Sequence, residues 1–117
     1  MKKFIPVNEP LITNSDVLSV SKVMKSGWIS SEGPNVKLFE KKFAKYIGHK
    51  NAIAVSSGTA ALEVAIKSLN LKKGDEVIAP NFTIISSTLA VIKEGLKIKF
   101  IDCDLYDWNM NLDKTIK

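Results

Sequence analysis

The sequence predicts an α/β protein built on a parallel sheet. Residues 51–101 read as strand, helix, strand, helix and strand, an order that requires right-handed crossover connections. The strand segments, such as residues 76–79, show little alternation of apolar and polar side chains, which is typical of strands covered on both faces. The 117 residues fit one domain of ordinary size.

Two helices are expected before the first strand. The first spans residues 16–26 behind a cap at Asn14 or Ser15, and the second spans residues 35–47. Glycine follows each helix and is expected to end it. The apolar stripe of the first helix consists of Val17, Val20, Val23 and Met24, and that of the second of Val36, Phe39, Phe43 and Ile47.

Strands are expected at residues 51–55, 76–79 and 97–101, with helices at 60–69 and 86–93 between them. Polar and turn-forming residues separate these segments. The first of these two helices is expected to bury Ala61, Leu62, Ala65, Ile66 and Leu69. Ligands of parallel sheets sit beyond the carboxyl ends of the strands, so the segments after each strand are the first places to look for chemistry.

The composition excludes several functional classes. A hydrophobic fraction of 45% argues against disorder, and one Cys excludes an internal disulfide. The 17 basic residues are all Lys and lie scattered, which does not favour nucleic-acid binding. No apolar run reaches the roughly 20 residues that cross a bilayer, and the first residues do not form a secretory signal. We therefore expect a cytoplasmic protein without metal, membrane or nucleic-acid partner.

The segment Ser57–Ala60 lies at a strand-to-helix turn. Gly58 allows close approach of a ligand, and the helix start offers free N–H groups and the positive end of its dipole. Hydroxyls of Ser57 and Thr59 add hydrogen bonds, so the segment can cradle a phosphate. It can also be a helix cap without a ligand. It matches neither the Walker loop nor the G-x-G-x-x-G motif.

Three further groups are candidates with structural alternatives. A flat ligand could lie against Phe82 or Ile84, which otherwise are core contacts at a helix start. Trp28, with Ser30 and Ser31, could contact a substrate or a partner subunit, or simply cover the core edge. Asp102 and Asp104 could bind a metal or serve as acid and base, but they more simply cap the next turn. Cys103 between them is expected to be a small buried residue. No role is assigned to His49.

Several segments together resemble the fold-type-I, pyridoxal-phosphate-dependent sugar aminotransferases, the DegT/DnrJ/EryC1/StrS family. The resemblance runs from Ile5 to the end of the chain. Its landmarks, in order, are Ile5-Pro6, Ser26–Ser31 with Gly33, Phe39-Glu40, Ser56–Leu62, Gly74–Pro80, Phe82-Thr83, Gly95 and Phe100–Asp102. Trp28–Ser31 and Trp108–Met110 are most similar to perosamine-synthetase-type members, which act on a GDP-linked 4-keto-6-deoxymannose in O-antigen assembly.

The resemblance implies a role for nine residues. Ser57, Gly58, Thr59 and Ala60 would hold the phosphate of pyridoxal 5'-phosphate (PLP). Ile84 would pack on the pyridine ring, where many members carry an aromatic side chain. The positions matching the sugar-nucleotide site, often at a subunit boundary, are Asn8, Trp28, Ser30 and Ser31. No catalytic and no metal-binding residue is assigned.

The same resemblance implies an incomplete enzyme. The Schiff-base lysine of the family lies downstream in a Ser-x-His-x-x-Lys segment that this chain lacks. We expect residues 1–117 to be the amino-terminal part of the large domain, with a helical lead-in at 1–50 and a βαβαβ segment at 51–117, inactive alone. The intact protein would be a homodimer moving an amino group from an amino acid, glutamate, to a nucleotide-linked 4-keto sugar. The alternatives are a non-catalytic remnant that binds a sugar nucleotide or a partner, and an unrelated Rossmann-like nucleotide binder.

Overall fold

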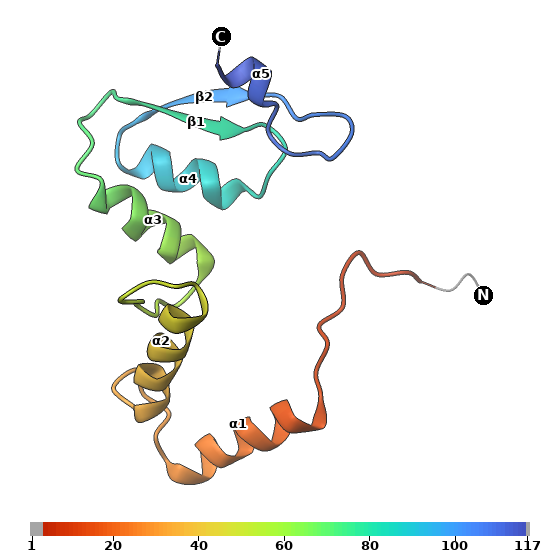
Figure 1. The fold of residues 1–117 in the computed structure, drawn as a ribbon, viewed down its shortest axis with the longest axis vertical. Coiled ribbons are helices and arrows are strands. Elements are labelled where there is room, and N and C mark those ends of the chain that lie inside the picture. Colours follow the sequence, from red (N-terminus) through yellow and green to blue (C-terminus); the bar gives the residue numbers. More distant parts are fainter. Residues whose placement is uncertain (1–3, 117) are drawn as a thin grey trace. The chain divides into compact units, whose positions relative to one another are not determined.

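A computed structural model describes residues 4–116 and divides the chain into two compact units, Met1–Ala54 and Val55–Lys117. The first unit contains helices α1 (Asn14–Ser26) and α2 (Pro34–Tyr46). The second contains α3 (Gly58–Ser68), β1 (Glu76–Pro80), α4 (Ile85–Lys93), β2 (Lys97–Ile101) and the short α5 (Leu112–Thr115), as labelled in Figure 1. The order of these elements confirms the predicted α/β class.

Helix α1 begins at Asn14, behind a capping box and two residues earlier than the sequence pattern indicates. The cap is Thr13, so the predicted caps Asn14 and Ser15 were wrong. The Thr13 hydroxyl donates to the Asp16 carboxylate at 2.7 Å and the Thr13 amide donates to it at 2.8 Å, and these hydrogen bonds lower the pKa of Asp16. Gly27 ends the helix as expected, because its φ of 74° places it in the left-handed region.

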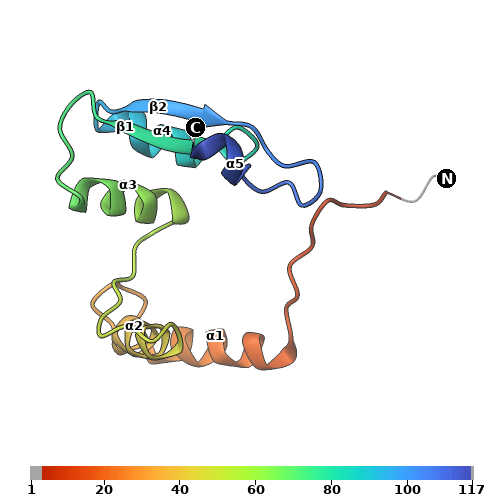
Figure 2. The same ribbon diagram turned by 45° about the horizontal axis from the view of Figure 1, so that its top comes forward.

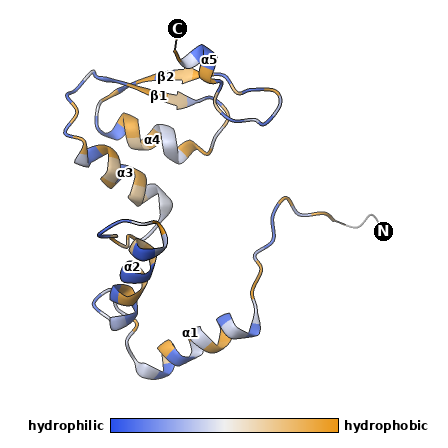
Figure 3. Cartoon of the chain, viewed as in Figure 1, coloured by the Kyte–Doolittle hydropathy of each residue, from blue (hydrophilic) through white to orange (hydrophobic). Residues whose placement is uncertain are grey.

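Helix α2 starts at Pro34, whose fixed φ suits the first helical position. Its apolar side chains gather on one face, where the rings of Phe39 and Phe43 lie 5.7 Å apart. Figure 3 shows hydrophobic and hydrophilic bands alternating along this helix. Gly33 and Ala44 are buried in the described part of this unit, and Ala44 is its buried hydrophobic side chain.

The second unit is a β–α–β arrangement. Strands β1 and β2 pair in parallel, from Glu76 with Lys97 to Pro80 with Ile101. Helix α4 connects them and contacts both strands, and α3 contacts α4 (Figures 1 and 2). Because the strands are parallel, their carboxyl ends meet at one edge, and the amide of Asn81 extends the ladder there by donating to the Ile101 carbonyl at 2.8 Å.

The core of this unit lies between α4 and the sheet, and its buried side chains are Ala79, Ala90, Val91 and Leu96. Helix α3 does not contribute to it as predicted. None of its residues is buried in the described structure, and Leu62 and Leu69 are 38% and 62% exposed. The apolar period placed these residues on one face of α3 correctly, but the residues that the structure describes leave most of that face uncovered.

The strand predicted at residues 51–55 is absent from the described structure, whose sheet has two strands. The backbone of this segment finds a side-chain partner instead. The amide of Ala54 donates to the carboxylate of Glu40 on α2 at 2.9 Å. In the described structure this apolar run pairs with no strand and forms the connection between α2 and α3.

Candidate functional site

The predicted phosphate cradle lies at the start of α3. Ser57 is the helix cap, and its hydroxyl accepts the amide of Ala60 at 3.1 Å. The amides of Gly58 and Thr59 precede the first turn of helical hydrogen bonds and have no partner in the described residues. A Cβ added at Gly58 would meet nothing within 4 Å, so this face of the turn is open. The turn thus presents two free N–H groups at the positive end of a helix.

The start of α4 adjoins this turn. The hydroxyls of Thr59 on α3 and Ser86 on α4 lie 2.9 Å apart and are half-buried. Ile84 is the cap residue of α4 and leaves its side chain 70% exposed. The Thr59–Ser86 pair therefore places the Ser57–Ala60 turn beside the first turn of α4. Ser86 was not singled out, because nothing in a linear pattern pairs it with Thr59.

The residues expected to contact the substrate lie in the first unit. Trp28 is 55% exposed and lines a cavity of about 400 Å³ between α1 and the start of α2. Ser30 and Ser31 follow it in an exposed turn that is closed by a hydrogen bond from the Gly33 amide to the Ser30 carbonyl at 3.1 Å. A Cβ at Gly33 would lie 3.2 Å from that carbonyl oxygen, so the tight turn favours glycine.

Asn8 is separate from this turn within the first unit. It is exposed and lies in the segment before α1. In residues 4–116 its side chain forms no hydrogen bond with the Trp28 turn. The structure thus groups Trp28, Ser30 and Ser31 in one loop but does not bring Asn8 to them.

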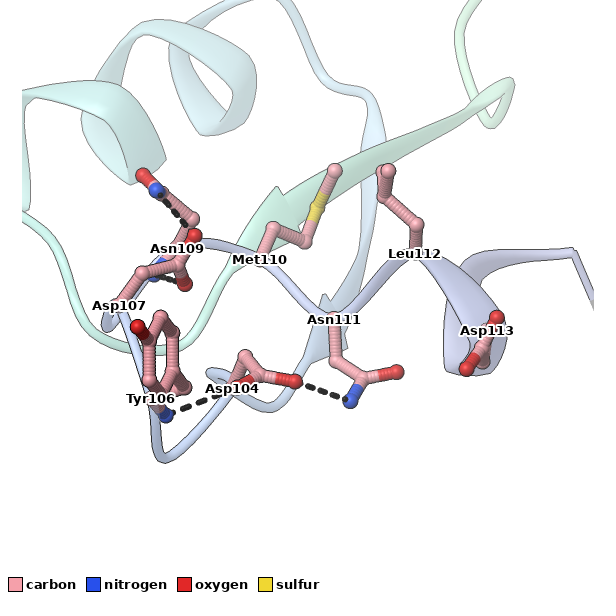
Figure 4. A pocket seen from close by; sticks show the side chains of 8 residues that line it. All are labelled: Asp104, Tyr106, Asp107, Asn109, Met110, Asn111, Leu112 and Asp113. Atoms are coloured by element: carbon pink, nitrogen blue, oxygen red, sulfur yellow. Dashed lines mark hydrogen bonds between the residues drawn. The ribbon is translucent and has the colours of Figure 1, made fainter.

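The acidic segment after β2 forms a closed loop. Asp102 accepts the Cys103 amide at 3.0 Å and the Lys114 ammonium at 3.2 Å. Asp104 accepts the Tyr106 amide at 2.8 Å and the Asn111 side-chain amide at 3.3 Å (Figure 4). Both carboxylates therefore cap the turn, the simpler of the two roles considered from the sequence. Cys103 is half-buried and forms an isolated antiparallel bridge with Met110.

An open cavity of about 650 Å³ lies against this loop. Its lining includes Asp107, whose carboxylate accepts both the amide and the side-chain nitrogen of Asn109, at 3.0 and 2.9 Å. These hydrogen bonds lower the pKa of Asp107 below its ordinary value of 3.8. The full lining, drawn in Figure 4, is Asp104, Tyr106, Asp107, Asn109, Met110, Asn111, Leu112 and Asp113.

Replacing Asn109 with alanine is expected to raise the pKa of Asp107 towards 3.8. The side-chain hydrogen bond is the largest cause of the lowered pKa, so its loss should account for most of the change. In the unaltered chain, the stabilisation from this carboxylate is complete above 3.8 and is lost as the pH falls through the lower, folded pKa. Carboxyl-detected NMR titration measures both proteins, and an unchanged Asp107 midpoint in the variant would contradict this assignment.

Residues 4–116 contain neither a metal-binding cluster nor a helix that could span a membrane. No three His, Cys, Asp or Glu side chains gather in an arrangement that could hold a metal ion. Among the helices described, none has the length and apolar character to cross a membrane.

The chain is similar to known proteins over most of its length. The sequence profile of the DegT/DnrJ/EryC1/StrS aminotransferase family matches residues 10–117. The chain belongs to this family.

Curated relatives in the family are more than a third identical to the chain over the aligned residues. GDP-perosamine synthase of Escherichia coli O157:H7 is 39% identical over 110 residues, which cover 94% of this chain and 30% of that protein. The spore coat polysaccharide biosynthesis protein SpsC of Bacillus subtilis (strain 168) is 40% identical over 110 residues, 94% of this chain and 28% of that protein. The chain thus spans about 30% of the length of these relatives.

Solved structures show the same fold. GDP-4-keto-6-deoxy-D-mannose-3-dehydratase of E. coli, solved with bound hydrated PLP, aligns with a TM-score of 0.83 and 31% identity over 92% of this chain and 29% of that one. An aminotransferase from Psychrobacter cryohalolentis aligns with a TM-score of 0.78 and 33% identity over 92% of this chain and 27% of that one. The DegT/DnrJ/EryC1/StrS family is PLP-dependent, and the α/β unit is part of a fold-type-I domain.

Proposed function

We propose that this chain forms the cofactor-phosphate and sugar-nucleotide part of a PLP-dependent enzyme that transfers an amino group from glutamate to a nucleotide-linked 4-keto-6-deoxy sugar. The product would serve polysaccharide or O-antigen synthesis in the cytoplasm. The observation that carries the proposal is the pair of free amides at Gly58 and Thr59, beside the Thr59–Ser86 hydroxyl pair. The relatives GDP-perosamine synthase and GDP-4-keto-6-deoxy-D-mannose-3-dehydratase suggest the class of substrate.

The residues fit the phosphate of PLP. A dianionic phosphate needs several N–H and O–H donors, and the start of α3 offers two amides and the Thr59 hydroxyl beside the helix dipole. The Ser57 hydroxyl already accepts the Ala60 amide, so Ser57 and Ala60 shape the turn, and Ser57 can still donate its proton. Ile84 would supply an apolar contact for the pyridine ring, weaker than the aromatic contact of many relatives.

When bound, PLP would carry the amino group between the two substrates and hold the electron pair released on the way. The described residues would bind and orient PLP and the sugar nucleotide. The amides of Gly58 and Thr59 would fix the phosphate, and Ile84 would exclude water from one ring face. Trp28, Ser30, Ser31 and Asn8 would contact the sugar nucleotide. We assign no catalytic residue within this chain, so the lysine that bonds to PLP would come from outside residues 1–117.

We propose the same division of the chain as the sequence analysis gave, with a helical lead-in at 1–50 and the α/β segment at 51–117. The intact enzyme is proposed to be a homodimer.

A second candidate reaction is the removal of a sugar hydroxyl on the same scaffold. It is supported by a variant of GDP-4-keto-6-deoxymannose-3-dehydratase with bound GDP-perosamine. That structure aligns with a TM-score of 0.84 and 30% identity over 94% of this chain and 30% of that one.

Replacing Thr59 with valine is the test of the phosphate site. Valine keeps the shape of threonine and removes its hydroxyl, so PLP binding should weaken about 10-fold or more, the range of a hydrogen bond to a charged group. Pyridoxal, which lacks the phosphate, should bind the variant and the unaltered chain equally. Equilibrium dialysis with each ligand measures both affinities.

Ser68→Ala is the matched control, because its hydroxyl bonds the Ala65 carbonyl at 2.7 Å at the opposite end of the same helix. It should leave both affinities unchanged. Equal loss of PLP and pyridoxal binding in the Thr59 variant would contradict a phosphate role. Failure of the unaltered chain to bind PLP would overturn the proposed function of this segment.

A further inference from the structure

Two aromatic rings meet at the carboxyl end of the sheet. Phe82 lies in the connection between β1 and α4, and Trp108 lies in the loop after β2. Their ring centroids are 5.4 Å apart at an angle of 48°, a tilted arrangement that aromatic pairs favour. Both remain more than half exposed, at 64% and 57%. The proposed function uses neither ring.

The backbone of Trp108 is held in an unfavourable conformation. Its φ is 62°, in the left-handed region that bulky residues rarely adopt. The loop enforces this conformation through hydrogen bonds from the Trp108 amide to the Asp104 carbonyl at 3.0 Å and from the Asp104 amide to the Asn109 carbonyl at 2.7 Å. Strain of this kind persists only where the surrounding structure fixes it and is concentrated at functional sites.

The contact constrains the start of α4. The connection that carries Phe82 is short, with the Asn81 amide bonded to the Ile101 carbonyl at 2.8 Å at one end. At its other end Ile84 caps α4 and accepts the Ser87 amide at 3.2 Å. Holding the Phe82 ring between these fixed points therefore limits where Thr83 and Ile84 can lie.

We propose that Trp108 is a positioning residue that acts through Phe82 to hold the 81–84 connection, and with it Ile84, in place for the pyridine ring of PLP. The proposal rests on the proposed function in assigning the ring contact to Ile84. The strained tip of the loop after β2 would in this way set the geometry at the start of α4. Tyr106 in the same loop is 95% exposed and makes no ring contact in the described residues, so it provides the matched comparison.

The test combines hydrogen–deuterium exchange of the peptide spanning residues 80–88, without ligand, with equilibrium dialysis against PLP. Trp108→Ala removes the ring and should speed exchange in this peptide and weaken PLP binding, each by about 3- to 10-fold, the range that one aromatic pair supplies. Trp108→Phe keeps an aromatic ring and should restore most of both. Tyr106→Ala should change neither.

Unaltered exchange and PLP affinity in Trp108→Ala would overturn the positioning role while leaving the proposed function standing. If the unaltered chain does not bind PLP, the proposed function fails, and the exchange data alone then decide whether Trp108 holds the connection. If Trp108→Ala does not fold, Phe82→Leu breaks the same contact from the other side. The same local loss of protection is expected from it, and normal protection would refute the proposal.

Discussion

Replacing Gly58 with alanine is expected to weaken PLP binding by about 10- to 100-fold while leaving the fold intact. In the ligand-free chain an added Cβ meets nothing within 4 Å, and alanine favours a helix more than glycine does. A phosphate bonded to the amides of Gly58 and Thr59 would occupy this open space, and the added methyl group would be overpacked against it. Binding and stability should therefore change in opposite directions, as dialysis and urea unfolding can show.

Gly48→Ala is the matched control for this experiment. Its added Cβ also meets nothing within 4 Å, but its φ of 72° is strained for alanine. This variant should lose about 1 kcal/mol of stability and keep its PLP affinity. If Gly58→Ala binds PLP as tightly as the unaltered chain, the phosphate does not lie against this turn.

Replacing Val91 with alanine is expected to destabilise the second unit by about 2 kcal/mol. Val91 is 3% exposed on α4, in the core that this helix forms with the sheet. Two methyl groups would be lost and a cavity left behind. Few side chains of this unit are buried, so the loss is a large fraction of its stability.

Ile92→Ala serves as the comparison, since the neighbouring Ile92 is 56% exposed and loses less contact. It should cost less than about 1 kcal/mol. Urea unfolding of the three proteins, monitored by circular dichroism, measures the difference. Equal destabilisation by the two variants would mean that the face of α4 turned towards the sheet is assigned wrongly.

The β1–α4–β2 unit could be predicted because its signals are local. The apolar runs at 76–79 and 97–101, and the glycine that follows the helix between them, gave elements that agree with the structure to within one residue. The strand at 51–55 could not be judged in this way. Its apolar run indicates extended structure, but whether it joins a sheet depends on a partner strand, and the structure gives Ala54 a carboxylate instead.

The same distinction separates the parts of the candidate site. The turn at Gly58 could be predicted from its residue types, because a serine followed by a glycine favours a helix start, whether or not an anion binds there. The pairing of Thr59 with Ser86, and that of Phe82 with Trp108, join residues far apart in the sequence. The first pairing forms only when α4 packs beside α3, and the second only when the loop after β2 closes.

The parallel pairing of β1 with β2 also bears on the order of folding. Both strands and the helix that joins them lie within residues 76–101, so their register is set by closing one short loop. Contacts between residues close in sequence form faster than distant ones. During synthesis on the ribosome, we therefore expect the β1–α4–β2 unit to assemble soon after residue 101 emerges. It would then offer the later-synthesised loop that carries Trp108 a preformed surface on which to close.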